Sequence, residues 1–175
     1  MKKNYKELLH GVSTFIFDVD GVLTDGSVLI TSSGELLRKM SIKDGYAIKT
    51  AIDCGYRVCI ISGGSNAGVK SRLQGLGVTD IFLGAGFKDE VLGEYILDYN
   101  LKPHELLYMG DDIPDLPAMK LCGLITCPKN AVPEVKAVSD YVSPYEGGAG
   151  CVRDIIEQVL KLSGNWKINF DAALD

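Results

Sequence analysis

Short apolar segments alternate with helical patterns along most of the chain, and this alternation restricts the fold more than any other feature of the sequence. We predict strands at residues 14–17, 57–61, 81–83, 106–109 and 124–126, with a weaker one at 140–142. We predict helices between them at residues 45–54, 66–76, 89–99, 114–121, 132–138 and 152–162. This order is typical of an α/β fold, a Rossmann-like parallel sheet sandwiched by helices.

One segment interrupts the alternation directly after the first strand. Two strand-like pieces within residues 26–40 are joined by Thr31-Ser32-Ser33-Gly34, which predicts a β-hairpin insertion too small to be a domain. A free hairpin cannot bury all of its apolar residues, which are Val28, Leu29, Ile30, Leu36 and Leu37. The hairpin therefore either folds over the mouth of a site or packs against another subunit.

Composition predicts a single domain over residues 1–175, because 46% apolar and 23% charged residues are ordinary for a globular protein of this length. The net charge of -5 argues against nucleic acid as a partner, and no apolar run is long enough to span a membrane. The N-terminal segment is unlike a signal peptide, and the odd number of cysteines without CxxC spacing fits reduced thiols. We expect a cytoplasmic protein with a mobile tail at residues 164–175, although Trp166 and Phe170 suggest that the tail docks.

Unusual polar residues follow four successive predicted strands. They are Asp18 and Asp20, then Ser62 with Gly63 and Gly64, then Lys88, then Asp111, Asp112 and Asp115. In a parallel sheet the carboxyl ends of the strands share one edge, and ligands bind there near a topological switch point. We therefore expect these residues to form one site.

The chemistry of this set fits metal-assisted work on a phosphate. Hard oxygen ligands that suit Mg²⁺ are offered by Asp18, Asp20, Asp111 and Asp112. Lys88 adds positive charge where phosphate charge accumulates, and Ser62 with nearby backbone N–H groups can hold a phosphate oxygen. One carboxylate of the first strand exit can then attack phosphorus and form an aspartyl-phosphate, while the other transfers the protons.

These motifs resemble, in order, the four motifs of the haloacid dehalogenase superfamily of phosphatases. They are DVDGVLTD, the Ser62 exit, Lys88 and GDDIPD, and they cover nearly the whole chain. The resemblance implies that Asp18 is the nucleophile and that Asp20 is the general acid/base, with its main-chain oxygen on the metal.

The same resemblance assigns the remaining residues of the site. It implies that Ser62, Gly63 and Lys88 bind phosphate and that Asp111 is the third protein ligand of the metal. Asp112 is expected close by, either as a further ligand or as a neighbour of the ligands, and Asp115 is expected to orient the loop.

Finer features resemble a small-cap branch of the superfamily, because the chain has no room for a cap domain. The shared features are a DxDGVxTDG opening, a KDGYAI segment, a GDDxxD loop and a GGxGxxRD turn at residues 147–154. The resemblance implies a homotetramer built through the hairpins. It also implies Mg²⁺-dependent removal of phosphate from an eight-carbon keto-deoxy sugar acid, on the way to lipopolysaccharide.

The residues that select the sugar are harder to identify from the sequence than the residues that bind phosphate. Many relatives of this branch carry a charged side chain where this chain has Gly64, so the sugar must be bound by other residues. Arg72, Lys43 and Arg153 are predicted to bind the substrate carboxylate, since arginine suits bidentate contacts. Ser62 is expected to cap the following helix as well as to bind phosphate.

Three alternatives remain at this stage. The substrate could be a nine-carbon keto-deoxy sugar phosphate. A phosphomutase is disfavoured because it needs a cap that shields the intermediate from water. A catalytically silent oligomerisation or regulatory module is disfavoured because every required carboxylate is present.

Overall fold

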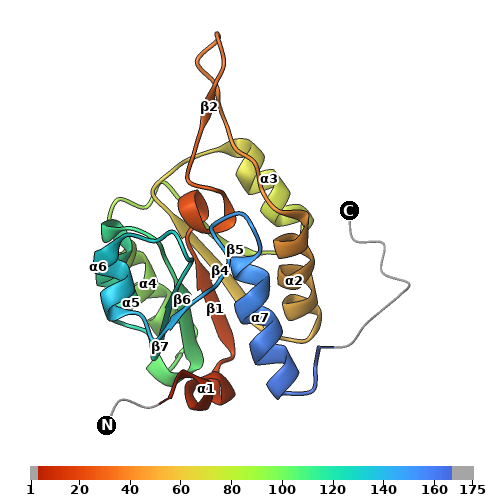
Figure 1. The fold of residues 1–175 in the computed structure, drawn as a ribbon, viewed down its shortest axis with the longest axis vertical. Coiled ribbons are helices and arrows are strands. Elements are labelled where there is room, and N and C mark those ends of the chain that lie inside the picture. Colours follow the sequence, from red (N-terminus) through yellow and green to blue (C-terminus); the bar gives the residue numbers. More distant parts are fainter. Residues whose placement is uncertain (1–3, 167–175) are drawn as a thin grey trace.

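A six-stranded sheet, in the order β5-β4-β1-β6-β7-β8, lies at the centre of the computed structural model, which describes residues 4–166 (Figure 1). All of its strand pairs are parallel. The strands are β1 Thr14–Phe17, β4 Arg57–Ser62, β5 Asp80–Leu83, β6 Leu106–Met109, β7 Leu124–Cys127 and β8 Tyr141–Val142. Each lies within one residue of its predicted bounds, so the predicted α/β fold is confirmed.

Helices cover both faces of the sheet. They are α1 Tyr5–Leu8, α2 Ile42–Asp53, α3 Ala67–Gly75, α4 Lys88–Asp98, α5 Leu116–Met119, α6 Pro133–Val138 and α7 Cys151–Leu162. Figure 1 shows α2, α3 and α7 on one side of the sheet and α4, α5 and α6 on the other. Strand β1 is buried on both faces, because Phe15 and Phe17 pack into the first helix layer and Ile16 packs into the second.

Polar side chains cap the starts of α2 and α3. Helix α2 begins three residues before its predicted start, since Ser41 accepts a hydrogen bond from the Asp44 amide. The expectation that Ser62 caps α3 is wrong, because Asn66 accepts the bond from the Val69 amide at 3.0 Å. Ser62 is therefore free of that structural role.

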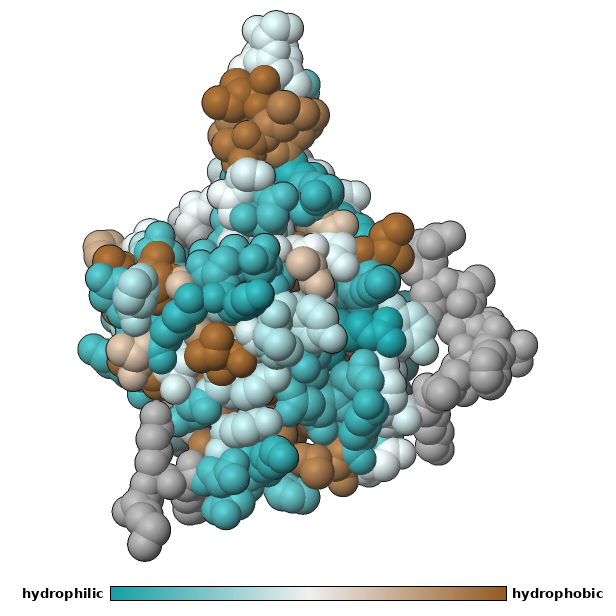
Figure 2. Space-filling view, viewed as in Figure 1, coloured by the Kyte–Doolittle hydropathy of each residue, from teal (hydrophilic) through white to brown (hydrophobic). Residues whose placement is uncertain are grey.

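The inserted hairpin consists of β2 Leu29–Ile30 and β3 Leu36–Leu37, which pair antiparallel with Leu29 opposite Leu37. It projects away from the body of the molecule (Figure 1). Its five apolar side chains remain exposed, and Figure 2 shows them as an apolar patch along the stem of the hairpin. The tip does not fold over the sheet, which favours the expectation that the hairpin packs against another subunit.

The end of the described chain docks on the helices. Trp166 packs against the core on the α2–α7 side, where its ring lies edge-on to Tyr46 and under the guanidinium of Arg153. The rest of the predicted tail, including Phe170, lies outside the described residues. No helix within residues 4–166 has the length and apolar character needed to cross a bilayer.

The strand order fixes where a ligand can bind. From β1 the chain builds β4 and β5 on one side, then crosses to build β6, β7 and β8 on the other. The loops after β1, β4 and β6 therefore leave the sheet at a topological switch point, the usual position of a ligand in such sheets.

Candidate active site

A cavity of about 290 Å³ opens at this switch point. Every strand-exit residue singled out from the sequence lines it: Asp18, Asp20, Ser62, Gly63, Gly64, Lys88, Asp111, Asp112 and Asp115. Residues from four separate parts of the sequence thus share one cavity because the parallel strands place their carboxyl ends side by side.

Asp18 is the first residue after β1 and is only 6% exposed. Its Oδ1 atom accepts a hydrogen bond from the Val19 amide at 2.7 Å and lies 3.0 Å from Nζ of Lys88. Burial alone would lower the pKa of Lys88, but the charges of Asp18 and Asp115 outweigh it and raise that pKa. Lys88 is therefore a fixed cation beside the Asp18 carboxylate.

Asp115 is fully buried and holds this arrangement together. Its Oδ1 accepts from Lys88 at 2.7 Å and from the Tyr108 hydroxyl at 2.9 Å. Its Oδ2 accepts from the amides of Asp111 at 3.0 Å and Asp112 at 3.3 Å. The expectation that Asp115 orients the loop is confirmed, and both of its oxygens already have two donors.

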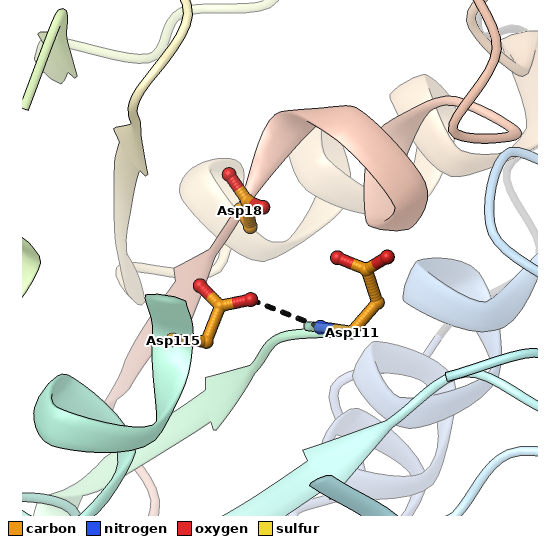
Figure 3. A group of neighbouring side chains, drawn as sticks. All are labelled: Asp18, Asp111 and Asp115. Carbon is orange, nitrogen blue, oxygen red and sulfur yellow. Dashed lines mark hydrogen bonds between the residues drawn. The ribbon is translucent and has the colours of Figure 1, made fainter. Parts of the chain in front are cut away.

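Carboxylate oxygens of Asp18, Asp111 and Asp115 lie within 4.8 Å of one another (Figure 3). Among the described residues, the buried Oδ1 of Asp111 has no hydrogen-bond partner. Burial, and then repulsion from Asp115, raises the pKa of Asp18 to about 6 even though Lys88 opposes the shift. Burial and repulsion from Asp115, Asp18 and Asp112 raise the pKa of Asp111 to about 7.

This cluster fits a hard divalent cation. A cation would relieve the repulsion and satisfy the unpartnered oxygen, and Mg²⁺ prefers a few carboxylates. Since Asp115 is saturated by donors, Asp18 and Asp111 are the side chains that would hold the ion.

The backbone after Asp20 lies directly against Asp111. Gly21 has a φ of 89°, and a Cβ atom at this position would collide with the Asp111 carboxylate. Thr24 shapes the same turn, since its Oγ1 accepts hydrogen bonds from the amides of Gly21 at 3.2 Å and Gly26 at 3.3 Å. The main chain at Asp20 is thus close to the acidic cluster, as its expected contribution to the metal requires.

Asp112 lies at the edge of the acidic cluster, and its role as a metal ligand stays a prediction. It is exposed, it is not part of the close carboxylate group, and its Oδ1 accepts from the Ile113 amide at 2.7 Å. It caps the short helical turn Ile113–Asp115 at the rim of the cavity. The turn directs the Asp112 side chain back to its own backbone.

Ser62 and its glycines face the acidic cluster across the cavity. Ser62 ends β4, is 2% exposed, and its Oγ accepts from the Gly64 amide at 3.3 Å. Without a helix to cap, its hydroxyl can donate into the cavity beside Gly63. This position fits the expected contact with a phosphate oxygen.

Arg38, at the base of the hairpin, is a residue of the site that the sequence reasoning missed. Its guanidinium binds the Asp20 carboxylate with both a 2.7 Å and a 3.1 Å hydrogen bond. The sequence offered one indication of this contact. Arg38 lies at the end of a predicted hairpin that directly follows the DVDGVLTD motif, so a basic side chain there can return to Asp20.

The three predicted carboxylate-binding residues do not reach this cavity. Lys43 and Arg153 line a separate cavity of about 480 Å³ along α7, and Arg153 lies 3.3 Å from Glu157. The Arg72 guanidinium packs against Gly45 of α2. Their helices direct these side chains elsewhere, and their contact with substrate stays a prediction.

The glycine-rich turn at residues 147–150 supports the catalytic loop of its own chain. The Gly148 amide donates to the Val22 carbonyl at 2.9 Å, and Gly147 is packed too closely on Gly21 to carry a side chain. Buried Asp44 fixes the end of this turn by accepting from the amides of Gly150 and Arg153.

The fold and this site together define a phosphohydrolase of the haloacid dehalogenase class.

Comparisons with known proteins agree with this class and narrow it. Residues 86–155 match the family model of the haloacid dehalogenase-like hydrolases. The 3-deoxy-D-manno-octulosonate 8-phosphate phosphatase of Escherichia coli K12 is 33% identical over 87% of this chain and 81% of its own length. The enzyme of that name from Haemophilus influenzae is 31% identical over 96% of this chain and 93% of its own length.

A solved structure shows the same similarity. The 3-deoxy-D-manno-octulosonate 8-phosphate phosphatase of Moraxella catarrhalis, in complex with magnesium, phosphate and KDO, superimposes with a TM-score of 0.90 at 30% identity, covering 95% of each chain. The present chain belongs to the haloacid dehalogenase-like hydrolases, in the family of the 3-deoxy-D-manno-octulosonate 8-phosphate phosphatases.

Proposed function

We propose that this protein is a Mg²⁺-dependent phosphomonoesterase that hydrolyses 3-deoxy-D-manno-octulosonate 8-phosphate to the free sugar acid and phosphate, a step in lipopolysaccharide precursor synthesis. The observation that carries the proposal is the convergence of Asp18, Asp111 and Lys88 on one cavity, with Asp111 Oδ1 left unpartnered among the described residues. The names of the relatives supply the sugar.

Asp18, Asp111 and the main chain at Asp20 would hold Mg²⁺, and the bound ion would supply positive charge that offsets the charge of the substrate phosphate. Lys88 adds a second positive charge, and Ser62 with the Gly63 backbone orients the phosphate oxygens. These groups neutralise the phosphate so that an anionic carboxylate can approach it.

The reaction then proceeds in two displacements at phosphorus. In the first, a carboxylate oxygen of Asp18 bonds to phosphorus, the bond from phosphorus to the sugar oxygen breaks, and Asp20 gives that oxygen its proton. In the second, Asp20 takes a proton from water, the water oxygen bonds to phosphorus, and the bond to Asp18 breaks to release phosphate. Both aspartates return to their starting states.

The substrate is tested by measuring phosphate release from the eight-carbon and nine-carbon keto-deoxy sugar phosphates, with Mg²⁺ and with a chelator. The proposal predicts a higher kcat/KM for the eight-carbon compound and no turnover without the metal. A preference for the nine-carbon compound would reassign the substrate. Absence of Mg²⁺-dependent activity on every phosphate monoester would instead favour a silent oligomerisation or regulatory module.

We also propose that residues 1–175 form one catalytic domain that assembles as a homotetramer through the hairpin. Leu29 and Ile30 are 68% and 66% exposed, more than a solitary chain in water would favour at adjacent apolar positions. Arg72, Lys43 and Arg153 lie outside the catalytic cavity of their own chain, so we assign their proposed carboxylate contacts to the site of a neighbouring subunit. The five free thiols fit a reducing, cytoplasmic compartment.

A further inference from the structure

Arg38 forms the most specific contact between the hairpin and the body of the protein. Its Nε lies 2.7 Å from Asp20 Oδ1 and its Nη2 lies 3.1 Å from Asp20 Oδ2. The Arg38 side chain is 10% exposed, whereas that of Asp20 is 36% exposed at the cavity. A planar guanidinium that binds both oxygens fixes the rotation of a carboxyl group as well as its position.

The remaining contacts of Arg38 attach it to the hairpin backbone. Its Nη1 donates to the Leu36 carbonyl at 3.2 Å, and the same carbonyl accepts from Asn66 Nδ2 at 3.1 Å. Asn66 caps α3, so one carbonyl joins the hairpin to the helix that follows the Ser62 loop. The Nε, Nη1 and Nη2 atoms of Arg38 therefore all donate hydrogen bonds within the protein, which leaves Arg38 poorly placed to bind a substrate carboxylate itself.

Gly64 provides the space that this pair occupies. A Cβ atom at position 64 would lie 3.1 Å from Asp20 Oδ2 and 3.5 Å from Arg38 Nη2. A larger residue would press on the ion pair from the cavity side. The ion pair between Arg38 and Asp20 is therefore best accommodated by a residue without a side chain at position 64.

We propose that Arg38 is a positioning residue for Asp20, and that the hairpin thereby takes part in the chemical step. This inference rests on the proposed function, in which Asp20 protonates the leaving sugar oxygen. Among the described residues, Arg38 is the only side chain that holds the Asp20 carboxyl group. Without it, that group rotates freely near the reacting atoms, and misplacement by about 1 Å can cost about 100-fold in rate.

The test compares kcat/KM of Arg38→Met on two substrates, because kcat/KM covers the steps up to departure of the leaving group. An alkyl leaving group, such as that of the preferred sugar phosphate, needs a proton, whereas p-nitrophenolate leaves without one. We expect a loss of about 100-fold on the sugar phosphate and only a few-fold loss on p-nitrophenyl phosphate. Equal losses on both substrates would overturn the proposal, since they would indicate a general structural role.

Two further variants sharpen the test. Lys39→Met is the matched control, because Lys39 is the next residue of the hairpin and its side chain is 82% exposed; it should leave both rates unchanged. In an Asp20→Asn background, Arg38→Met should add no further loss on the sugar phosphate, because a residue that acts through Asp20 has nothing left to position. Multiplicative losses in this double-mutant cycle would show that Arg38 acts independently of Asp20.

Measurements on the wild-type protein distinguish a wrong substrate assignment from a wrong role for Arg38. If wild-type protein hydrolyses p-nitrophenyl phosphate and another alkyl phosphate but not the eight-carbon substrate, the substrate assignment fails while the Arg38 comparison proceeds with that alkyl phosphate. Retained activity on p-nitrophenyl phosphate also shows that the Arg38 variant is folded.

Discussion

Lys88 and Asp115 form a buried ion pair at the centre of the site, with 2.7 Å between Nζ and Oδ1. The pair sets the position of Lys88 beside Asp18 and, through the second oxygen of Asp115, the course of the loop that carries Asp111. Asp115→Ala would leave Lys88 with Asp18 as its remaining carboxylate partner, and it would remove the acceptor of a buried hydroxyl and two amides. We predict that it lowers the free energy of unfolding by about 3–5 kcal/mol.

Urea unfolding of Asp112→Ala provides the control for that prediction. Asp112 belongs to the same loop but is exposed and caps only a short turn, so its loss should cost about 1 kcal/mol. Similar losses in the two variants would mean that the ion pair does not organise the loop.

Gly21 should be required for metal binding as well as for the turn. Gly21→Ala combines the strain of a positive φ with a collision against the Asp111 carboxylate, so we predict loss of Mg²⁺ binding, measured by calorimetry. Gly55→Ala is the matched variant, since Gly55 has a similar φ of 85° and open space around it. It should cost about 1–2 kcal/mol of stability and leave Mg²⁺ affinity intact. Normal Mg²⁺ affinity in Gly21→Ala would refute the proposed contact.

The acidic cluster predicts how stability and metal binding depend on pH. The pKa of Asp18 is raised from 3.8 to about 6 and that of Asp111 from 3.8 to about 7, so the metal-free folded state keeps protons that the unfolded state releases. Their contribution to stability is therefore present below about pH 4 and is lost as the pH rises through about 6 to 7. Because Mg²⁺ competes with these protons, it should raise Tm little at about pH 5 and much more at about pH 8.

Thermal melts with and without Mg²⁺ at the two pH values check this. Asp111→Asn should abolish the Mg²⁺-dependent rise in Tm at about pH 8. An equal rise at both pH values in the wild-type protein would contradict the assignment of Asp18 and Asp111 as the ligands.

The apolar hairpin should hold subunits together. We predict that Leu29→Lys dissociates the oligomer, because it places a charge at the most exposed apolar position of the hairpin. Light scattering would give the mass of the assembly. Leu97→Lys, on α4 and 80% exposed, is the control and should leave the assembly intact. An unchanged mass for Leu29→Lys would remove the hairpin from the interface.

The sequence predicted the strands well because each contains a short apolar run, and central strands such as β1 and β6 are buried on both faces. It predicted the main residues of the site because parallel strands must bring their exits to one edge. Both inferences depend on periodicity and chain order, which are visible without tertiary contacts.

Tertiary contacts decided the features that the sequence did not predict. Arg38 looks like a solvated hairpin charge until the fold places it on Asp20, 18 residues away in sequence. Ser62 was expected to cap the helix after β4, but the path of the turn places Asn66 at that position instead. The surroundings of Arg153 on α7, which are aromatic rings and Glu157, likewise depend on tertiary contacts, and its contact with substrate stays a prediction.

Asp18 is expected to carry the phosphoryl group during turnover. The most direct test uses Asp20→Asn with p-nitrophenyl phosphate and Mg²⁺, because this variant can form the aspartyl-phosphate but hydrolyses it slowly. After an acid quench and proteolysis, we predict a phosphoryl group on the peptide that contains Asp18, together with an initial burst of about one p-nitrophenolate per site. Continued release of p-nitrophenolate with no burst, and with that peptide unmodified, would show that Asp18 is not the nucleophile.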